Sequence, residues 1–300
     1  MHLSELPAVV AHLSGDPVPD WMRGAFRRRS ITFANGLTDI DTRVFWLQSQ
    51  RLTIDLRLPR CNEQVGSDEP ELFADYEGWY GDSVWDGQQL NWEGGASFQR
   101  HNRWPEAALL QRTGNCMTEF APSGVYVEDW RLLSDKPGPL IALELLSEQD
   151  LITGVSTERK GALIICGTLA GWVLDRQPDV ENQAENPAEN HEHGTVARNP
   201  FGFETAIGRG SLSDGFIVTD ALHPQRVGEP LLPLFGFANA EPGFVTQTLS
   251  QHDKALLRTF RVDTYDLNFA FSPATSTTHD AEAWYQDEAR TLTRYTRKVV

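Results

Sequence analysis

Strict alternation of apolar and polar residues marks the segment 52–58, which reads LTIDLRL. Leucine or isoleucine occupies every second position, and threonine, aspartate and arginine stand between them. Successive side chains of a strand point to opposite faces, whereas this spacing would scatter the apolar residues around a helix. The pattern therefore predicts a strand that turns its apolar face to a core and turns Asp55 and Arg57 the other way.

Most of the remaining chain consists of short apolar runs separated by Gly, Pro, Asn and Asp. Residues 25–34 and 42–49 flank the turn signal NGLTD and predict a hairpin. Residues 115–120 and 124–133 flank the turn APSG and predict a second one. The more apolar run 161–175 predicts a single strand buried on both faces. Many short strands without βαβ alternation favour an all-β, mainly antiparallel fold, either one barrel or two adjoining β lobes.

Two segments carry helix signals instead. In residues 67–81, Ser67 or Asp68 can cap the first turn and Gly81 can end the helix, so a short internal helix is predicted there. Residues 280–300 place acidic side chains early and basic side chains late. This order complements the helix dipole and predicts a C-terminal helix.

A chain of this length can form a single compact β unit over residues 1–300, and two lobes would divide near residues 134–140. One stretch differs from the rest, because residues 176–200 are acidic, amide-rich and interrupted by proline. Such a composition predicts a mobile loop. The motif HEH at 191–193 has the spacing of a metal pair, but ordering its backbone would cost about 1–2 kcal/mol per residue. No metal site is therefore predicted.

The charge balance limits the classes of partner. The chain has 42 acidic against 26 basic residues and a formal net charge of −16. This charge repels nucleic acid and anionic membrane surfaces, so neither is an expected partner. The cysteines, Cys61, Cys116 and Cys166, are odd in number and far apart, which predicts free thiols in a reducing compartment. No secretory signal or long apolar window is recognisable, so a cytoplasmic protein is expected.

Aromatic residues are the main candidates for ligand contacts. The chain has 9 Trp and 15 Phe, and large aromatics suit the lining of an apolar cavity. Trp46, Trp92 and Trp130 are chosen as candidates. Period two places Tyr126 and Glu128 on the same strand face as Trp130, a mixture that suits a wet pocket. The alternative for each tryptophan is ordinary core packing.

Charged residues supply a second set of candidates. Arg57 and Arg60 could hold a ligand carboxylate or phosphate, with Asp55 positioning the guanidinium. The alternative is a solvent-facing ion pair, which stabilises by only about 0–1 kcal/mol. His101 is the candidate general base, with Glu128 or Asp55 as its acid partner. The alternative is a structural histidine.

Three functions remain open on these residues. The first is a module that binds a small, largely apolar molecule in an aromatic-lined cavity. The second is a hydrolase, isomerase or cyclase that acts on such a molecule through a His/carboxylate pair, and the third is a protein-interaction module. The chain contains no P-loop, nucleophile elbow, HExxH or CxxC motif, so no cofactor is predicted. The ligand and the oligomeric state are left open.

The segment VFWLQSQRLTIDLRLPR resembles a signature of uncharacterised bacterial proteins, W-L-Q-(T/S)…D-(L/I)-R-(L/I)-P, and YEGWYG and YVEDW follow in the expected order. More distantly, FWLQ, NCMTEF and VYVEDWRLL are similar to a fungal casein-kinase-interacting family with a lipocalin-like fold. The resemblance implies a calycin-like β-barrel and no particular activity. The bacterial pattern places His after a tryptophan where this chain has Glu93 after Trp92, which argues against a catalytic role inherited from that His.

Overall fold

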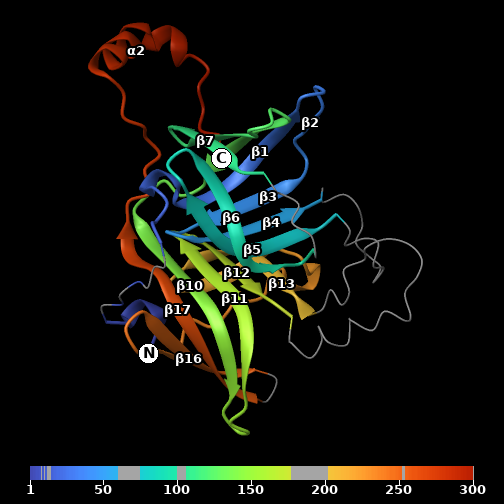
Figure 1. Cartoon of the computed structure of the whole chain (residues 1–300). Helices are drawn as coiled ribbons and strands as arrows, with labels where there is room; N and C mark the ends of the chain where they lie inside the picture. The colour runs from blue at the N-terminus through green and yellow to red at the C-terminus, as the bar shows by residue number, and fades with distance from the viewer. Residues whose placement is uncertain are drawn as a thin grey trace, which may run out of the picture.

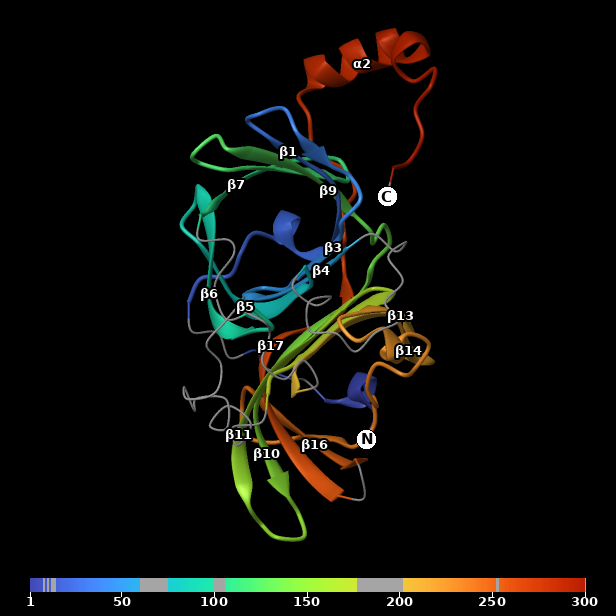
Figure 2. The same ribbon diagram turned by 90° about the vertical axis from the view of Figure 1, so that its right-hand side faces the viewer.

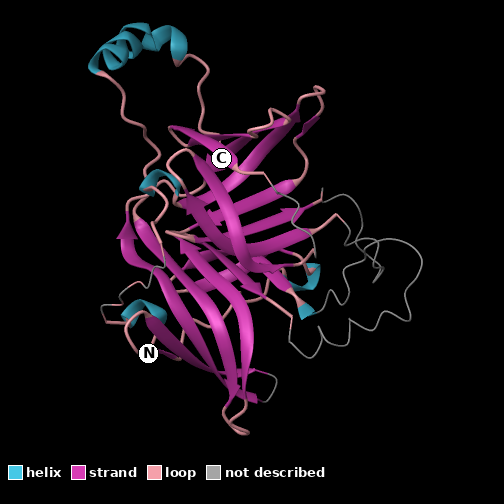
Figure 3. Ribbon diagram, in the orientation of Figure 1, coloured by secondary structure: helices cyan, strands magenta, loops and turns pink. Residues whose placement is uncertain are grey.

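The chain folds into two antiparallel β-sheets that pack against each other, as the computed structural model shows (Figures 1 and 3). The structure describes residues 1–7, 9, 11, 15–59, 75–99, 106–176, 202–251 and 254–299. The α-helix α2 (His279–Leu292) lies apart from both sheets. The prediction of an all-β, mainly antiparallel fold with a C-terminal helix is confirmed.

The first sheet is a closed barrel. Its strands are β1 (Gly24–Phe33), β2 (Thr38–Asp39), β3 (Arg43–Gln48), β4 (Leu52–Leu58), β5 (Glu77–Trp85), β6 (Gln89–Ser97), β7 (Ala108–Thr113), β8 (Cys116–Phe120) and β9 (Tyr126–Leu132). The order β1-β3-β4-β5-β6-β7-β8-β9 returns to β1, because β1 also pairs with β9. Closure leaves β2 as a short extension beside β1, and it removes the open edges that invite pairing with other chains.

The second sheet has eight strands in the order β14-β13-β12-β11-β10-β17-β16-β15. They are β10 (Gly138–Asp150), β11 (Ser156–Cys166), β12 (Leu169–Leu174), β13 (Glu204–Ser211), β14 (Gly215–Ala221), β15 (Phe237–Asn239), β16 (Phe244–Gln251) and β17 (Lys254–Phe269). The chain passes from the first sheet to the second between Leu132 and Gly138.

Short helices complete the fold within the described residues. They are the 3-10 helices η1 (Leu3–Glu5), η2 (Asp20–Met22) and η6 (Pro224–Arg226), besides α2. Thr278 caps α2, since its Oγ1 accepts a hydrogen bond from the Ala281 N–H, so the helix begins one residue before the predicted start and ends at Leu292 instead of reaching residue 300. No helix in the described ranges combines the length and apolar character needed to cross a bilayer.

The strand predicted over 52–58 is confirmed as β4, and all seven of its residues are buried. Its apolar face packs on the second sheet, where a Cβ atom at Gly171 of β12 would lie 3.3 Å from Ile54 Cδ1. Its polar face, with Asp55 and Arg57, lines the inside of the barrel. The alternating apolar and polar residues of β4 thus face two different buried environments, the contact with the second sheet and the inside of the barrel, and neither face points to solvent.

The internal helix predicted over 67–81 is wrong in its second half, because residues 77–81 belong to β5, and residues 67–74 lie outside the described part of the chain. Tyr80 pairs with Ile54 and so shares the face that packs on the second sheet, whereas Trp79 lines the inside of the barrel. Because aromatic side chains occupy both faces, Tyr80 on one and Trp79 on the other, the segment lacks the apolar–polar alternation of a half-buried strand.

The run 161–175 is a hairpin, so the prediction of a single strand is wrong. β11 ends at Cys166 and β12 begins at Leu169, and Gly167 takes the left-handed conformation between them, with φ +62°. Residues 161–166 of β11 and 169–173 of β12 are buried on both faces, so the apolar run continues up to the turn on each side and the glycine marks the turn.

The two largest hydrophobic clusters of the described residues stabilise the sheets. One fills the barrel and its contact with the second sheet, and it includes Phe26, Trp46, Ile54 and Ile164. The other covers the far face of the second sheet, where η1 packs against it through the fully buried Leu3. The barrel therefore shares one wall with the rest of the molecule, and its opposite wall faces outward.

Candidate functional site

The barrel interior gathers most of the residues that the sequence pattern selects. Register pairs place Trp46, Asp55 and Trp79 side by side on β3, β4 and β5. Trp92 from β6 and Trp130 from β9 complete an aromatic cluster around Trp46, with ring centroids 6.1 and 5.5 Å from it. We call this group of side chains and its charged neighbours the lumen cluster.

One charged pair of the lumen cluster lies on β4. Arg57 Nε and Nη2 donate to the two carboxylate oxygens of Asp55 at 2.7 and 3.3 Å. Arg57 is 8% exposed and Asp55 is 4% exposed, so the alternative of a solvent-facing ion pair is wrong. Burial alone would lower the pKa of Arg57, but the carboxylates of Asp55, Glu128 and Glu77 outweigh it and raise this pKa overall.

A second network joins β1, β8 and β9. The Trp130 Nε1–H donates to Glu128 at 2.9 Å and to Glu119 at 3.1 Å. Arg28 Nη1 donates to Glu128 at 2.8 Å, and the Tyr126 hydroxyl donates to Glu119 at 3.2 Å. The indole therefore holds two buried carboxyl groups close together.

The lumen cluster carries one carboxyl group in excess of its cations. Among side chains at least nine-tenths buried, Asp55, Glu119 and Glu128 face only Arg28 and Arg57. Burial, and then the charge of Glu128, raise the pKa of Glu119 well above its usual value. Burial and the neighbouring Glu128 therefore both favour the protonated form of Glu119.

Little free space remains between the described side chains of the lumen cluster. The cavity between the four tryptophans, Asp55, Arg57 and Glu119 has a volume of about 10 Å³, which is the space of about one water molecule. The described residues contain no cluster of three or more His, Cys, Asp or Glu side chains able to hold a metal ion. The lumen is thus packed with its own aromatic rings and ion pairs.

The structure brings together every predicted ligand contact that it describes: Trp46, Arg57, Trp92, Tyr126 and Trp130. The acid candidates Asp55 and Glu128 lie among them. Arg60 and His101 lie outside the described residues, so the pairing of His101 with a carboxylate stays a prediction. Sequence analysis missed Arg28 and Glu119, although Glu119 could have been found from its place opposite Glu128 in the predicted hairpin.

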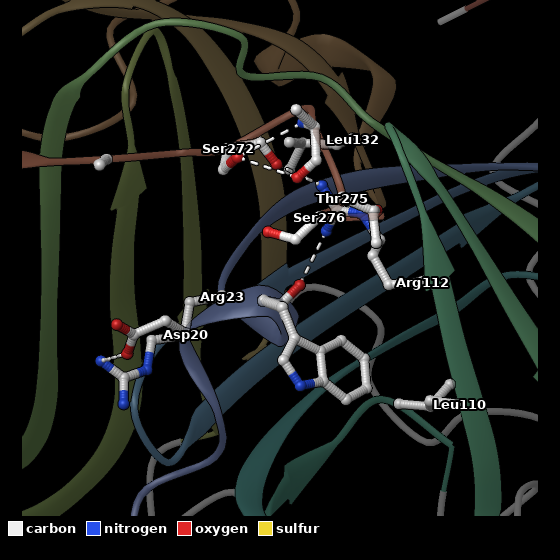
Figure 4. Close-up of a pocket in the computed structure, with 11 residues that line it drawn as sticks. Asp20, Arg23, Leu110, Arg112, Leu132, Ser272, Thr275 and Ser276 are labelled. Carbon is white, nitrogen blue, oxygen red and sulfur yellow. Dashed lines mark hydrogen bonds and ion pairs between the residues drawn. The ribbon is translucent and has the colours of Figure 1, made fainter. Parts of the chain in front are cut away.

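A much larger cavity lies at one end of the barrel. Its volume is about 640 Å³, and the helix η2 sits inside the ring of barrel strands at this end (Figure 2). Figure 4 shows the side chains around the cavity, which we call the mouth pocket; its lining residues are Asp20, Trp21, Arg23, Leu110, Arg112, Leu132, Ala270, Ser272, Ala274, Thr275 and Ser276.

Arg112 of β7 forms hydrogen bonds with several segments that line the mouth pocket. Its guanidinium donates to the carbonyl oxygens of Gly114 at 2.6 Å, Trp21 at 2.7 Å and Ser272 at 2.9 Å. It also lies 5.4 Å from the centre of the Phe26 ring. These contacts fasten η2 and the segment 270–276 to the barrel wall.

The two arginines of the mouth pocket differ in their partners. Arg23 forms an ion pair with Asp20 at 2.8 Å. Arg112 has no carboxylate partner among the described residues, because its three hydrogen bonds go to neutral carbonyl groups. Partial burial lowers the pKa of Arg112 below its usual value. It still carries a positive charge, since an arginine does not deprotonate in a protein.

Sequence analysis missed the mouth pocket because its parts are distant along the chain. Arg112 lies 91 residues from Trp21 and 160 residues from Ser272. No local spacing brings these residues together, and only the closed barrel and the strand β17 that leads to Ala270 do so. The local sequence of β7, ALLQRT, ends in three polar residues and gives Arg112 no distinguishing signal.

Comparisons with known proteins assign no family. No protein-family profile matches the chain, and no curated protein matches it. Among solved structures, the crystal structure of the uncharacterized protein YLR301w from Saccharomyces cerevisiae aligns with 81% of this chain and 98% of its own, at 12% identity and a TM-score of 0.47. That likeness carries no argument about function, and the bacterial and fungal resemblances stay predictions.

Proposed function

We propose that the protein is a small-molecule binding module whose ligand occupies the mouth pocket. The observation that carries the proposal is the contrast in free volume, about 640 Å³ at the mouth against about 10 Å³ in the lumen. Sites for small molecules commonly measure about 300–1,000 Å³. The ligand class is that expected from the sequence, but its place moves from the lumen to the barrel end.

The chemistry of the mouth pocket supports binding. Trp21, Leu110 and Leu132 offer an apolar surface, and the hydroxyl groups of Ser272 and Thr275 offer a few polar contacts. The described lining includes no histidine or cysteine, and its one carboxylate, Asp20, pairs with Arg23 and is 78% exposed. Because no described group there is placed for proton transfer, the enzyme hypothesis gains no support from this pocket.

The lumen cluster supports the floor of the mouth pocket. Phe26 lies beneath Arg112, its ring centroid lies 5.6 Å from that of Trp46, and Trp46 packs on Trp130. A packed aromatic series thus runs from the pocket into the barrel and holds the floor rigid. That the lumen residues contact a ligand themselves stays a prediction, and it requires these rings to move.

Indole N–H spectra test the proposal. The protein labelled with ¹⁵N at its 9 tryptophans is titrated with a panel of apolar carboxylates, amides and alcohols, and Trp21→Phe assigns the Trp21 resonance. We expect at least one compound to shift this resonance in a saturable way while Trp284 stays unchanged, because Trp284 is exposed on α2, away from the pocket. A panel that leaves Trp21 unshifted, or shifts Trp284 equally, contradicts the proposal.

A further inference from the structure

We infer that the mouth pocket selects a carboxylate ligand with an apolar body and binds its carboxylate at Arg112. The inference rests on the proposed function and names the ligand class of the same pocket. It starts from a charge that the described residues leave uncompensated. Each arginine of the lumen cluster contacts a carboxylate, and so does Arg23, whereas Arg112 contacts three carbonyl groups.

The donor count of Arg112 leaves room for a ligand. A guanidinium has five N–H bonds, and three of those of Arg112 are used by Gly114, Trp21 and Ser272. One N–H remains on Nη1 and one on Nη2. Guanidinium N–H groups form strong, charge-assisted hydrogen bonds with carboxylate oxygens.

A hydroxyl group beside Arg112 adds a further donor. Thr275 Oγ1 accepts a hydrogen bond from the Gly114 N–H at 2.7 Å, so its own O–H is left to donate. Figure 4 shows Thr275 next to Arg112 at the upper side of the pocket. A carboxylate oxygen between these two side chains would receive hydrogen bonds from both.

The rest of the pocket fits the apolar part of such a ligand. Trp21 is 37% exposed, and Leu110 and Leu132 close the barrel side of the pocket. A cation that has no ion-pair partner among the described residues, beside an apolar wall, matches an amphiphilic monoanion. A single guanidinium favours one negative charge over the two of a phosphate monoester, so we commit to the carboxylate.

Matched acid and amide pairs test the ligand class. Calorimetric titration compares decanoate with decanamide and phenylacetate with phenylacetamide, which differ only in the charged group. We expect the wild-type protein to bind at least one acid about tenfold more tightly than its amide, the size of one charge-assisted contact. Raising the salt concentration from 20 mM to 500 mM should weaken the acid more than the amide.

Two substitutions test whether Arg112 causes the preference for the acid over the amide. Arg112→Met should bring the acid-to-amide ratio of dissociation constants close to one. Arg131→Met, which removes the same charge from an arginine paired with Asp129 outside the pocket, should leave the ratio at its wild-type value. Circular dichroism checks that each variant is folded. If Arg112→Met does not fold, Arg112→Lys takes its place. This variant keeps the charge but loses the planar guanidinium, so we expect an acid-to-amide ratio between that of the wild type and one.

The possible results separate the two proposals. Equal binding of acid and amide by the wild-type protein overturns the carboxylate inference and leaves the binding function intact. Tighter binding of phenyl phosphate than of phenylacetate overturns it as well, since the site would then prefer a phosphate. Binding of neither acids nor amides, with no shift of the Trp21 indole resonance, removes the proposed function itself.

Discussion

The lumen cluster and the mouth pocket both contain arginine and tryptophan, but their arginines differ in the groups that they contact. In the lumen, Arg28 and Arg57 are less than a tenth exposed and each contacts a carboxylate. At the mouth, Arg112 contacts carbonyl groups beside a large cavity. An arginine paired with a carboxylate of the same protein can be buried in a packed interior. An arginine that contacts only neutral groups can instead bind an anion from outside the protein.

The largest expected effect follows from removing a lumen cation. Arg57→Met would leave Asp55 as a buried, unpaired carboxylate, so we expect the free energy of unfolding to fall by about 3–5 kcal/mol. Denaturant unfolding monitored by tryptophan fluorescence measures the change. The double variant Asp55→Asn/Arg57→Met should recover much of the loss, because it removes both charges. A loss below about 1 kcal/mol in Arg57→Met would show that the pair is not confined as described.

Trp130 provides a second test of the lumen. Trp130→Phe keeps an aromatic ring but removes the N–H that both Glu119 and Glu128 accept, and it leaves a small void. We expect a loss of about 2–3 kcal/mol in unfolding free energy. The matched substitution Trp21→Phe, in the half-exposed mouth, should change it by less than about 0.5 kcal/mol. Similar losses in both variants would contradict the distinction between the two regions.

The raised pKa of Glu119 predicts a dependence of stability on pH. The folded protein holds this proton above the usual pKa of 4.5, so the contribution of Glu119 is fully present below about pH 4.5 and is lost as pH rises through the folded-state pKa. The difference in unfolding free energy between wild type and Glu119→Gln should therefore fall with rising pH, by at most about 1.4 kcal/mol per pH unit. A difference that grows with pH would contradict the assignment.

Replacing the mouth arginine is expected to change stability much less than replacing a lumen arginine. Two of the three hydrogen bonds of Arg112 are exposed to solvent, so water can replace them in Arg112→Met. We expect a loss of about 1 kcal/mol in unfolding free energy, well below that of Arg57→Met under the same conditions. A loss as large as that of Arg57→Met would indicate that Arg112 serves mainly to hold the barrel end together.

The strand 52–58 could be predicted because its two faces meet chemically different surroundings. Its apolar face meets the second sheet and its polar face meets the lumen, so the alternation survives in the sequence. Residues 79–80 and the run 161–174 carry aromatic or apolar side chains on both faces. There the sequence predicted a helix in place of β5 and missed the turn at Gly167. Hydrophobic periodicity predicts a strand when its two faces differ in polarity, and it gives no signal when both faces are apolar.

The candidate site was predictable only in part, for a related reason. A period-two pattern is visible in the strands of Asp55 and Trp130, and Trp46 could be selected only as one of several large aromatic residues. The mouth pocket joins η2, β7 and the segment 270–276, which come together only when the barrel is closed and β17 has crossed the second sheet. Contacts over such separations leave no local pattern.

The pairing of β1 with β9 has a consequence for the growing chain. Gly24 begins the first barrel strand, yet the partner that completes its hydrogen bonding ends at Leu132. Until that partner has been synthesised, one side of β1 presents bare peptide groups, which another nascent chain could capture. A product terminated between β8 and β9 is therefore expected to aggregate, and partners so far apart predict slow folding of the intact protein.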